Sequence, residues 1–324
     1  KIKLDPNEKK TRTTQNLLIE SRKMKNLNML LLLSLCIAFI NPLFASERIC
    51  FDTKDIESIS ALSKSILWLV IPSLALFISF TVSAQAETVM NLSYLDIPIQ
   101  KIGRFMELHE QVTNMQQGDK RTLQGQWVTS HYYGSGPSVV IQDNYMNAND
   151  AINDTPWVHV GEKWEAASED ERKEMGAMVS EYQSFWNGHT DEMRRIDWQN
   201  DHIFNEDSDF SGNFILVIGK YNTSGNQGDM GQAYHDWVTV PAVESGVALF
   251  GNHSYHLTGS GSDVMVANGY KSMHEFATSL ENATSGSTEA RQKFWSLVEG
   301  AHNDQIYIHA GHTINKEFNL AGKD

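Results

Sequence analysis

The sequence predicts an α+β fold in which a βαββαβ unit occurs twice in tandem. The first observation behind this prediction is a repeated motif, His-x-x-Gly-Ser-Gly-x-x-Val, found at His131–Val139 and again at His256–Val264. The second is that segments with the alternation typical of strands and segments with helical spacing follow one another in the same order around each copy. An acidic chain that has a normal apolar content supports a globular fold with a sizeable core.

Further matches support a duplication. Tyr145 and Tyr270 keep the spacing of the motif, and other pairs keep the same order along the chain. The spacing is shorter after the hairpin in the second copy, so the first copy carries an insertion, for which the acidic segment Glu162–Glu174 is the candidate. The other matched pairs are His109-Glu110 with His235-Asp236, Phe185-Trp186 with Phe294-Trp295, and His189 with His302.

The first copy begins with an alternating strand and an amphipathic helix, whose apolar residues recur at steps of three and four. Two strands around Gly134-Ser135-Gly136 then form a hairpin. A helix with a capping box at Ser168-x-x-Glu171 and a short strand close the unit. The predicted ranges are Val89–Ile97, Ile99–Met115, Leu123–Tyr133, Ser138–Tyr145, a helix that reaches Trp186, and a strand near Met193–Trp198.

The second copy repeats this order after Asn200–Gly212, which is polar and acidic and is interpreted as a linker. The predicted ranges are the strand Phe214–Tyr221, the helix Met230–Val240, the hairpin strands Val247–Leu257 and Asp263–Tyr270, the helices Ser272–Leu280 and Thr288–Val298, and the strand Gln305–His309. Residues 87–199 and 213–324 are therefore expected to form two repeats.

Residues 1–86 are expected to be an upstream segment and a signal peptide rather than part of the fold. Lys64 precedes the apolar run Ile66–Val82, and Ala84-Gln85-Ala86 is typical of a cleavage site. The alternative is a pair of transmembrane segments, which Pro42 and Pro72 disfavour. We therefore expect a periplasmic or secreted protein that has no stable membrane association after cleavage.

The remaining 238 residues have 15 Lys and Arg, 33 Asp and Glu, and no cysteine. Disulfide and thiolate chemistry are therefore excluded from this part. Nucleic-acid binding is not expected either, because it needs a basic surface. The sequence leaves the oligomeric state open.

The order βαββαβ is that of the ferredoxin-like unit. Two such units in one chain resemble the dimeric α/β-barrel superfamily, here as a tandem fused pseudo-dimer, over Val89–His309. The resemblance implies a pseudo-twofold α/β barrel. The superfamily contains small monooxygenases, haem-handling enzymes and muconolactone-type isomerases, and its catalytic residues differ between members, so none is carried over to this chain.

Candidate site residues come from the duplication and from strand parity. Alternate residues share a face of a strand, so Trp127, His131 and Tyr133 lie on one side, and His256 occupies the matching position of the second copy. Histidine is the side chain best suited to acid–base work near neutral pH. His131 and His256 are therefore the predicted catalytic residues. The predicted substrate-binding residues are Trp127, Tyr133, Trp186, His109 and His235.

The pairs His253-x-x-His256 and His309-x-x-His312 would point to opposite faces of an extended strand, so no metal site is predicted. Haem and a transition metal stay open as cofactors. The expected function is binding of a small apolar or aromatic ligand, with monooxygenase-like oxidation or isomerisation as the reaction. The alternatives are a non-catalytic envelope or assembly module and a metal-binding exported protein.

Overall fold

The computed structural model describes residues 88–196, 201–205, 208–285 and 287–322. All described residues belong to one compact unit, 83–324. The upstream segment and signal peptide expected at 1–86 lie outside the described residues. Within the described part, no helix is long and apolar enough to cross a membrane.

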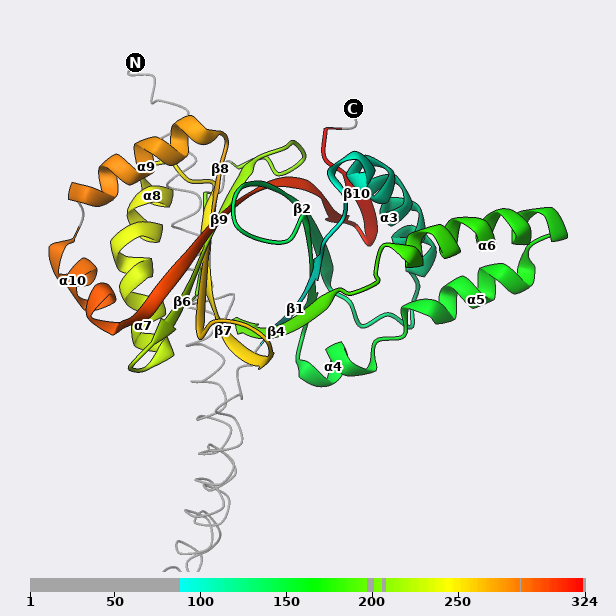
Figure 1. Ribbon diagram of the computed structural model, residues 1–324, viewed down its shortest axis with the longest axis horizontal. Helices are drawn as coiled ribbons and strands as arrows, with labels where there is room; N and C mark the ends of the chain where they lie inside the picture. Colours follow the sequence, from blue (N-terminus) through cyan, green and yellow to red (C-terminus); the bar gives the residue numbers. More distant parts are fainter. Residues whose placement is uncertain (1–87, 197–200, 206–207, 286, 323–324) are drawn as a thin grey trace, which may run out of the picture. The chain divides into compact units, whose positions relative to one another are not determined.

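Eight strands form a closed barrel (Figure 1). The strand order is β9-β2-β3-β1-β4-β7-β8-β6, and β6 pairs with β9 to close the ring; all these pairings are antiparallel. The strands are β1 Thr88–Leu95, β2 Gly125–Gly134, β3 Val139–Tyr145, β4 Thr190–Ile196, β6 Ile215–Thr223, β7 Phe250–Gly259, β8 Val264–Tyr270 and β9 Val298–Ile314.

The barrel strands are buried on both faces. In β8 every residue from Val264 to Tyr270 is buried, because one face meets the barrel interior and the other meets helices. The interior is lined by an apolar cluster that includes Met90, Ile218 and Met265. Most of the strands therefore carry apolar residues at both parities, as expected where both faces of a sheet are covered.

Helices cover two stretches of the outer surface (Figure 1). Phe105, Leu108 and Tyr182 belong to the core cluster beside β1, β2 and β3. Separate outer clusters lie against β6, β8 and β9. The helices of the first stretch are α3 Ile102–Gln116 and α6 Glu169–Ser184. Those of the second are α7 Gln227–Tyr234, α8 Val240–Glu244, α9 Met273–Ser285 and α10 Thr288–Leu297. The predicted capping box of α6 is confirmed, since Ser168 and Glu171 make both of its hydrogen bonds.

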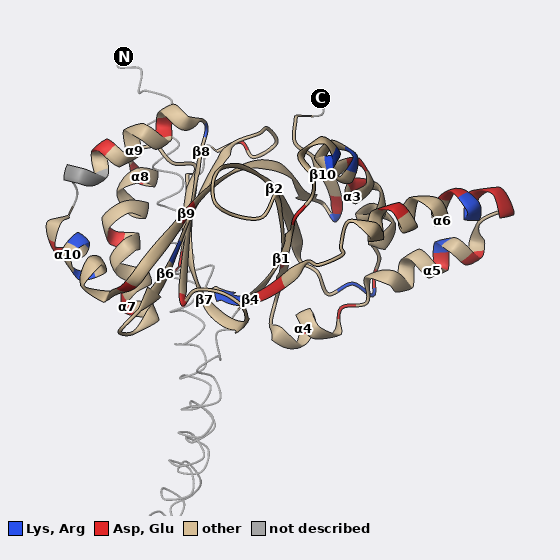
Figure 2. Ribbon diagram, in the orientation of Figure 1, with Lys and Arg blue, Asp and Glu red and all other residues tan. Residues whose placement is uncertain are grey.

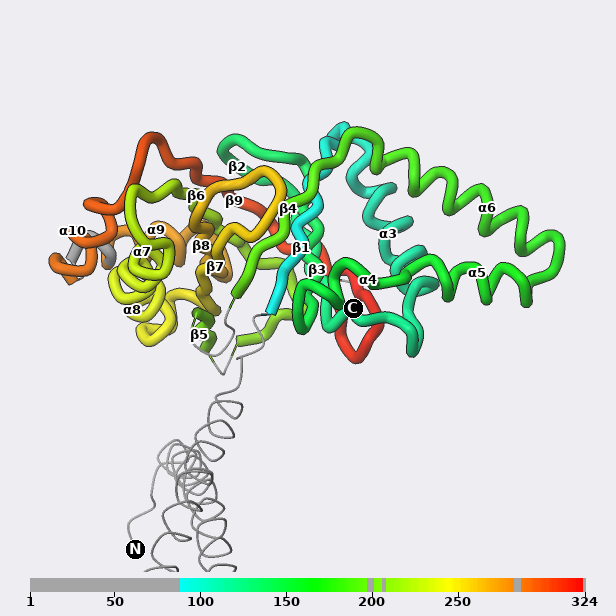
Figure 3. The backbone as a smooth tube through the Cα atoms, turned by 90° about the horizontal axis from the view of Figure 1, so that it is seen from below, coloured from blue at the N-terminus to red at the C-terminus, as the bar shows by residue number. Residues whose placement is uncertain are grey.

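The first half is longer than the second between its hairpin and the next barrel strand, and this insertion forms two helices that the sequence patterns did not reveal, α4 Ala148–Asn153 and α5 Pro156–Ala166. The candidate segment Glu162–Glu174 instead spans the end of α5 and the start of α6. Together α5 and α6 extend away from the barrel as an antiparallel pair (Figures 1 and 3). Much of the acidic charge of the first half lies on this pair (Figure 2).

Other elements differ from the expected ranges. The linker contains β5, His202–Phe204, which pairs with β7. The predicted helix at 230–240 is interrupted by a π-helical segment, His235–Thr239. β9 is far longer than the expected 305–309, because its first half continues the ladder with β6. An additional strand, β10 at Glu317–Leu320, pairs with β9. These features depend on partners that are distant in the sequence.

The two copies of the motif adopt the same local geometry. Gly134 and Gly259 have φ angles of +92° and +93°, where a side chain would be strained. The ring nitrogen Nε2 of His131 lies 3.1 Å from the carbonyl oxygen of Gly134, and that of His256 lies 3.2 Å from that of Gly259. Each histidine therefore closes its own hairpin.

Candidate functional site

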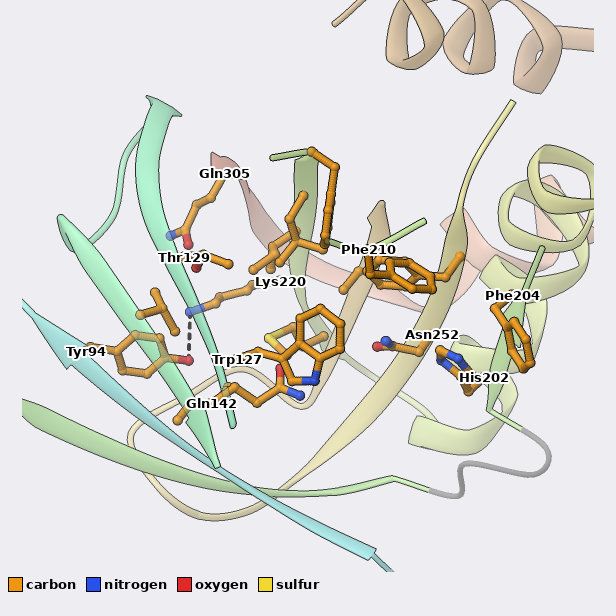
Figure 4. A pocket seen from close by; sticks show the side chains of 18 residues that line it. Tyr94, Trp127, Thr129, Gln142, His202, Phe204, Phe210, Lys220, Asn252 and Gln305 are labelled. Carbon is orange, nitrogen blue, oxygen red and sulfur yellow. Dashed lines mark hydrogen bonds between the residues drawn. The ribbon is translucent and has the colours of Figure 1, made fainter. Parts of the chain in front are cut away.

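The barrel interior contains a cavity of about 320 Å³ (Figure 4). Its walls come from seven barrel strands together with residues of the segment between β4 and β6. The lining residues are Leu92, Tyr94, Trp127, Thr129, Val140, Gln142, His202, Phe204, Phe210, Phe214, Leu216, Ile218, Lys220, Phe250, Asn252, Met265, Ala267 and Gln305. This volume is at the lower end of the range for small-molecule sites.

One side of the cavity is aromatic. Trp127 lies edge-on to Phe210, with ring centroids 6.1 Å apart, and Phe214 lies edge-on to Phe250 at 5.7 Å. These are the edge-to-face arrangements that aromatic rings prefer. They leave flat surfaces that face the cavity, and such surfaces suit a planar ligand.

The other side of the cavity is polar. Lys220 Nζ donates a hydrogen bond to Tyr94 Oη at 3.1 Å, and Tyr94 Oη donates to Glu192 Oε2 at 2.7 Å (Figure 4). Glu192 forms an ion pair with Arg194, and both side chains are fully buried. The chain of contacts therefore links the Lys220 amine, through Tyr94, to the buried Glu192–Arg194 ion pair. It places Lys220 and Tyr94 on the cavity wall.

Arg194 is fixed by bonds from several directions. Its Nε donates to Ser254 Oγ at 3.0 Å, and its two Nη groups donate to the carbonyl oxygens of Ser254 and Ser262 at 2.9 and 3.0 Å. A Cβ at Gly261 would collide with the Glu192 carboxylate. The second Gly-Ser-Gly turn thus leaves space for the carboxylate that orients Tyr94.

Burial shifts the protonation of the polar groups. It lowers the pKa of Lys220, although Glu192 acts in the opposite direction. Burial and the neighbouring Glu192 carboxylate raise the pKa of Tyr94 far above its ordinary value, so the phenol stays neutral. Lys220 therefore loses a proton more readily than an exposed lysine, while Tyr94 holds its own proton against Glu192.

The sequence-predicted residues fall in different places. Trp127 lines the barrel cavity. His131 and His256 do not belong to its lining; the ring of His131 packs edge-on against Tyr307, 5.7 Å away, at the end of the barrel. Tyr133 is 69% exposed on the same hairpin. The catalytic role of the two histidines stays a prediction, and their observed contacts are with hairpin carbonyls.

The other predicted residues lie outside the barrel. His109 and Trp186 are brought together in a second cavity, between β2–β3 and the helices that cover them. His235 lies in the π-helical segment, where its ring meets that of His253 at 5.7 Å. The structure therefore separates the five predicted binding residues into four environments.

Sequence reasoning missed Lys220 and Tyr94. A signal for Lys220 was present, because Leu216, Ile218 and Lys220 alternate along β6 and share its inner face. A lysine at that parity in an apolar strand indicates a buried amine. Tyr94 could not be found in this way, because its partner Glu192 is distant in the sequence.

A bulge in β9 changes the geometry expected for one histidine pair. The register against β2 shifts between Val128 and Thr129, which pair with Gly311 and His309. Consequently His312 Nδ1 and His309 Nε2 lie 3.2 Å apart instead of on opposite faces. Even so, no group of three or more metal-ligating side chains occurs among the described residues.

The barrel cavity does not fit haem. It is smaller than a tetrapyrrole with its side chains, and His202 is its one histidine in the described residues. The ring of His202 lies between those of Phe204 and Phe250, with centroids 5.7 and 6.1 Å away.

No protein-family model matches the chain, and no curated protein matches its sequence. Similar solved structures include an anthrone oxidase-like protein, at 10% identity and a TM-score of 0.44, covering 74% of this chain and 94% of that one. Two others are provisionally named monooxygenases. The one from Fusobacterium nucleatum has 10% identity, a TM-score of 0.48 and coverages of 71% and 95%. The one from Lactobacillus acidophilus has 6% identity, a TM-score of 0.46 and coverages of 73% and 97%.

Proposed function

We propose that the barrel binds a small planar molecule that has an apolar ring system and one acidic oxygen, and that it catalyses oxidation or isomerisation of this molecule. The observation that carries the proposal is the position of Lys220 and Tyr94 opposite the aromatic wall of Trp127 and Phe214. An apolar cavity with a few convergent polar groups is the usual form of a small-molecule site.

The polar side provides an acid–base group. A neutral Lys220 amine can accept a proton from a carbon next to a carbonyl group, and Tyr94 can donate a hydrogen bond to the oxyanion that develops. The resulting enolate is common to both reactions. With O2 as the oxidant, a CH2 group becomes a carbonyl and the second oxygen atom leaves as water. Without O2, reprotonation at another carbon gives an isomer.

We also propose that the barrel consists of two ferredoxin-like repeats related by a pseudo-twofold axis, and that residues 1–86 direct export to the periplasm or medium. The equivalent contacts of His131 with Gly134 and of His256 with Gly259 support the first proposal. The Ala84-Gln85-Ala86 sequence supports the second. Proteolytic mapping of the N-terminus of the secreted protein tests export.

Binding is tested by calorimetry with 2-naphthol and 2-methylnaphthalene, which differ in the oxygen substituent. We expect 2-naphthol to bind at least tenfold more tightly. Lys220→Met should remove this preference, whereas Lys271→Met, at an exposed position, should keep it. Trp127→Leu should weaken both ligands. Equal affinity of the two ligands for the unmodified protein contradicts the role of the polar side.

Turnover is tested with 2-tetralone, an enolisable ketone that has an aromatic ring. Exchange of its C1 protons in D2O, followed by NMR, reports proton removal, and oxygen uptake reports oxidation. Both signals should decrease at least a hundredfold in Lys220→Met. Tight binding without exchange or oxygen uptake would contradict the enzymatic part and favour a non-catalytic binding protein.

A further inference from the structure

A second cavity, of about 390 Å³, lies outside the barrel beneath α4 and α5. The insertion in the first half supplies part of its wall, including Asp154 and Trp157. Barrel strands β2 and β3 supply the floor, and α3 and α6 supply the remaining side. The cavity is thus present where the chain is longer, and it shares no lining residue with the barrel cavity.

The walls are aromatic. Trp157, Trp186, Tyr145 and Tyr182 all line the cavity. Trp157 is 41% exposed and lies at the surface, whereas both tyrosines are buried. Aromatic faces attract cations through their quadrupole, and groups of aromatic side chains are used to bind organic ammonium ions.

The floor carries one carboxylate without a cationic partner. Gln126 Nε2 donates to Asp143 Oδ1 at 2.7 Å, and in the described part of the chain this is its one hydrogen bond. The nearby Arg121 forms an ion pair with Asp154 at 2.8 Å, and both side chains are about 95% buried. Arg121 Nη1 has no hydrogen-bond partner among the described residues, and the guanidinium lies close enough to oppose the rise in the pKa of Asp143. The charge of Asp143 is therefore the net charge of the cavity.

The contacts behind Gln126 fix its orientation. Burial lowers the pKa of His109 to about 4, so its imidazole is neutral. Its Nδ1 lies 3.0 Å from Tyr182 Oη, and its Nε2 lies 2.8 Å from Gln126 Oε1. Tyr182 therefore donates to Nδ1, and Nε2–H donates to Gln126, whose amide must then present its NH2 group to Asp143. This arrangement makes Asp143 Oδ1 an acceptor of the Gln126 amide.

The other half of the barrel provides a natural comparison. Asn268 occupies in β8 the position that Asp143 occupies in β3, two residues before the tyrosine that ends each strand. Asn268 is 1% exposed and bonds to Thr239 and Tyr234. The neutral Asn268 side chain thus lies where neighbouring side chains fill the space, whereas the Asp143 carboxylate lies at an open cavity.

From this geometry we propose that the second cavity binds an organic ammonium ion, with its charged nitrogen at Asp143 and its apolar body against Trp157 and Trp186. The nitrogen donates a hydrogen bond to the carboxylate, and the aromatic faces replace the water that the cation loses. The site is independent of the function proposed for the barrel.

The proposal is tested by calorimetry with 2-phenylethylammonium and with 2-phenylethanol, its neutral counterpart. We expect the ammonium ion to bind at least tenfold more tightly at pH 7.5. Asp143→Asn should remove this preference without unfolding the protein, because the second half already has asparagine at that position. Glu244→Gln removes one exposed carboxylate and should leave the preference unchanged.

A pH series adds a second readout. Burial raises the pKa of Asp143 to about 6, so the preference for the ammonium ion should decrease about tenfold between pH 7.5 and pH 5. The titratable and charged groups that face Asp143 are Arg121, Asp154, Asp191, Tyr145 and Tyr182, with His109 behind Gln126.

Two further variants locate the binding. Trp157→Ala should weaken ammonium binding at least fivefold, whereas Trp127→Leu, in the barrel cavity, should leave it unchanged. The proposal is overturned if the ammonium ion binds no more tightly than the alcohol, or if Asp143→Asn keeps the preference. Sensitivity to Trp127→Leu alone would place the ligand in the barrel and would overturn it as well.

Discussion

Replacement of Asp143 by asparagine is expected to stabilise the folded protein at neutral pH. The carboxylate has one hydrogen bond, from Gln126, and no ion pair within the described residues. Burial raises its pKa from 3.8 to about 6, so folding favours the protonated form. Asparagine keeps the oxygen that Gln126 needs and removes the charge.

The size of the effect follows from the pKa. A raised carboxyl pKa means that the folded state holds more protons than the unfolded state between about pH 4 and pH 6. The contribution of Asp143 to stability therefore falls as the pH rises through this window. The shift corresponds to at most about 3 kcal/mol. Because the side chain faces a cavity and is partly solvated, we expect about 1–3 kcal/mol.

Urea unfolding at several pH values provides the assay. The free energy of unfolding of Asp143→Asn should exceed that of the unmodified protein above pH 7, and the two should converge below pH 4. Glu244→Gln, which removes an exposed carboxylate, should show no such window. Destabilisation by Asp143→Asn at pH 8, or a difference that does not change with pH, would refute the reasoning.

Two other predictions concern the hairpins and the buried ion pair. Gly134→Ala and Gly259→Ala should each destabilise the fold by about 2 kcal/mol or more. Both φ angles are positive, and a Cβ would lie 2.7 Å from a backbone oxygen at Gly134 and 2.5 Å from one at Gly259. Equal losses of stability in thermal unfolding would indicate equivalent roles, and no loss in either variant would contradict the geometry. Arg194→Met should lower the free energy of unfolding by about 3–5 kcal/mol, because it leaves Glu192 unpaired. This loss of stability should be smaller when Glu192→Gln is added. Independent effects of the two substitutions in urea unfolding would show that the side chains are not coupled.

Local patterns in the sequence were sufficient for most secondary structure. Alternation and helical spacing predicted seven of the eight barrel strands close to their observed positions, whereas β9 is much longer than the predicted 305–309. Ser168 and Glu171 correctly marked the start of α6. These features depend on neighbours within a few residues. The sequence patterns did not predict the helix α5 or the π-helical segment at His235–Thr239, because the form of both depends on packing against distant elements.

The candidate sites divide in the same way. Strand parity grouped Trp127 with His131 and Tyr133, but in the structure only Trp127 of these three lines the barrel cavity. The same parity reasoning applied to β6 would have found Lys220. Parity failed for His309 and His312, because a bulge set by pairing with β2 lies between them. One added residue in a strand reverses every side chain that follows it.

By itself, the sequence determined the α+β class, the duplicated hairpin motif and the order of the elements, since these arise from short-range periodicity and turn chemistry. The tertiary structure alone decided how the strands close on themselves and therefore which side chains meet. Tyr94 reaches Glu192 across two adjacent strands, and Asp143 faces open space because an insertion forms a roof there. Such contacts join residues far apart in the chain, and only the packing of the whole barrel specifies them.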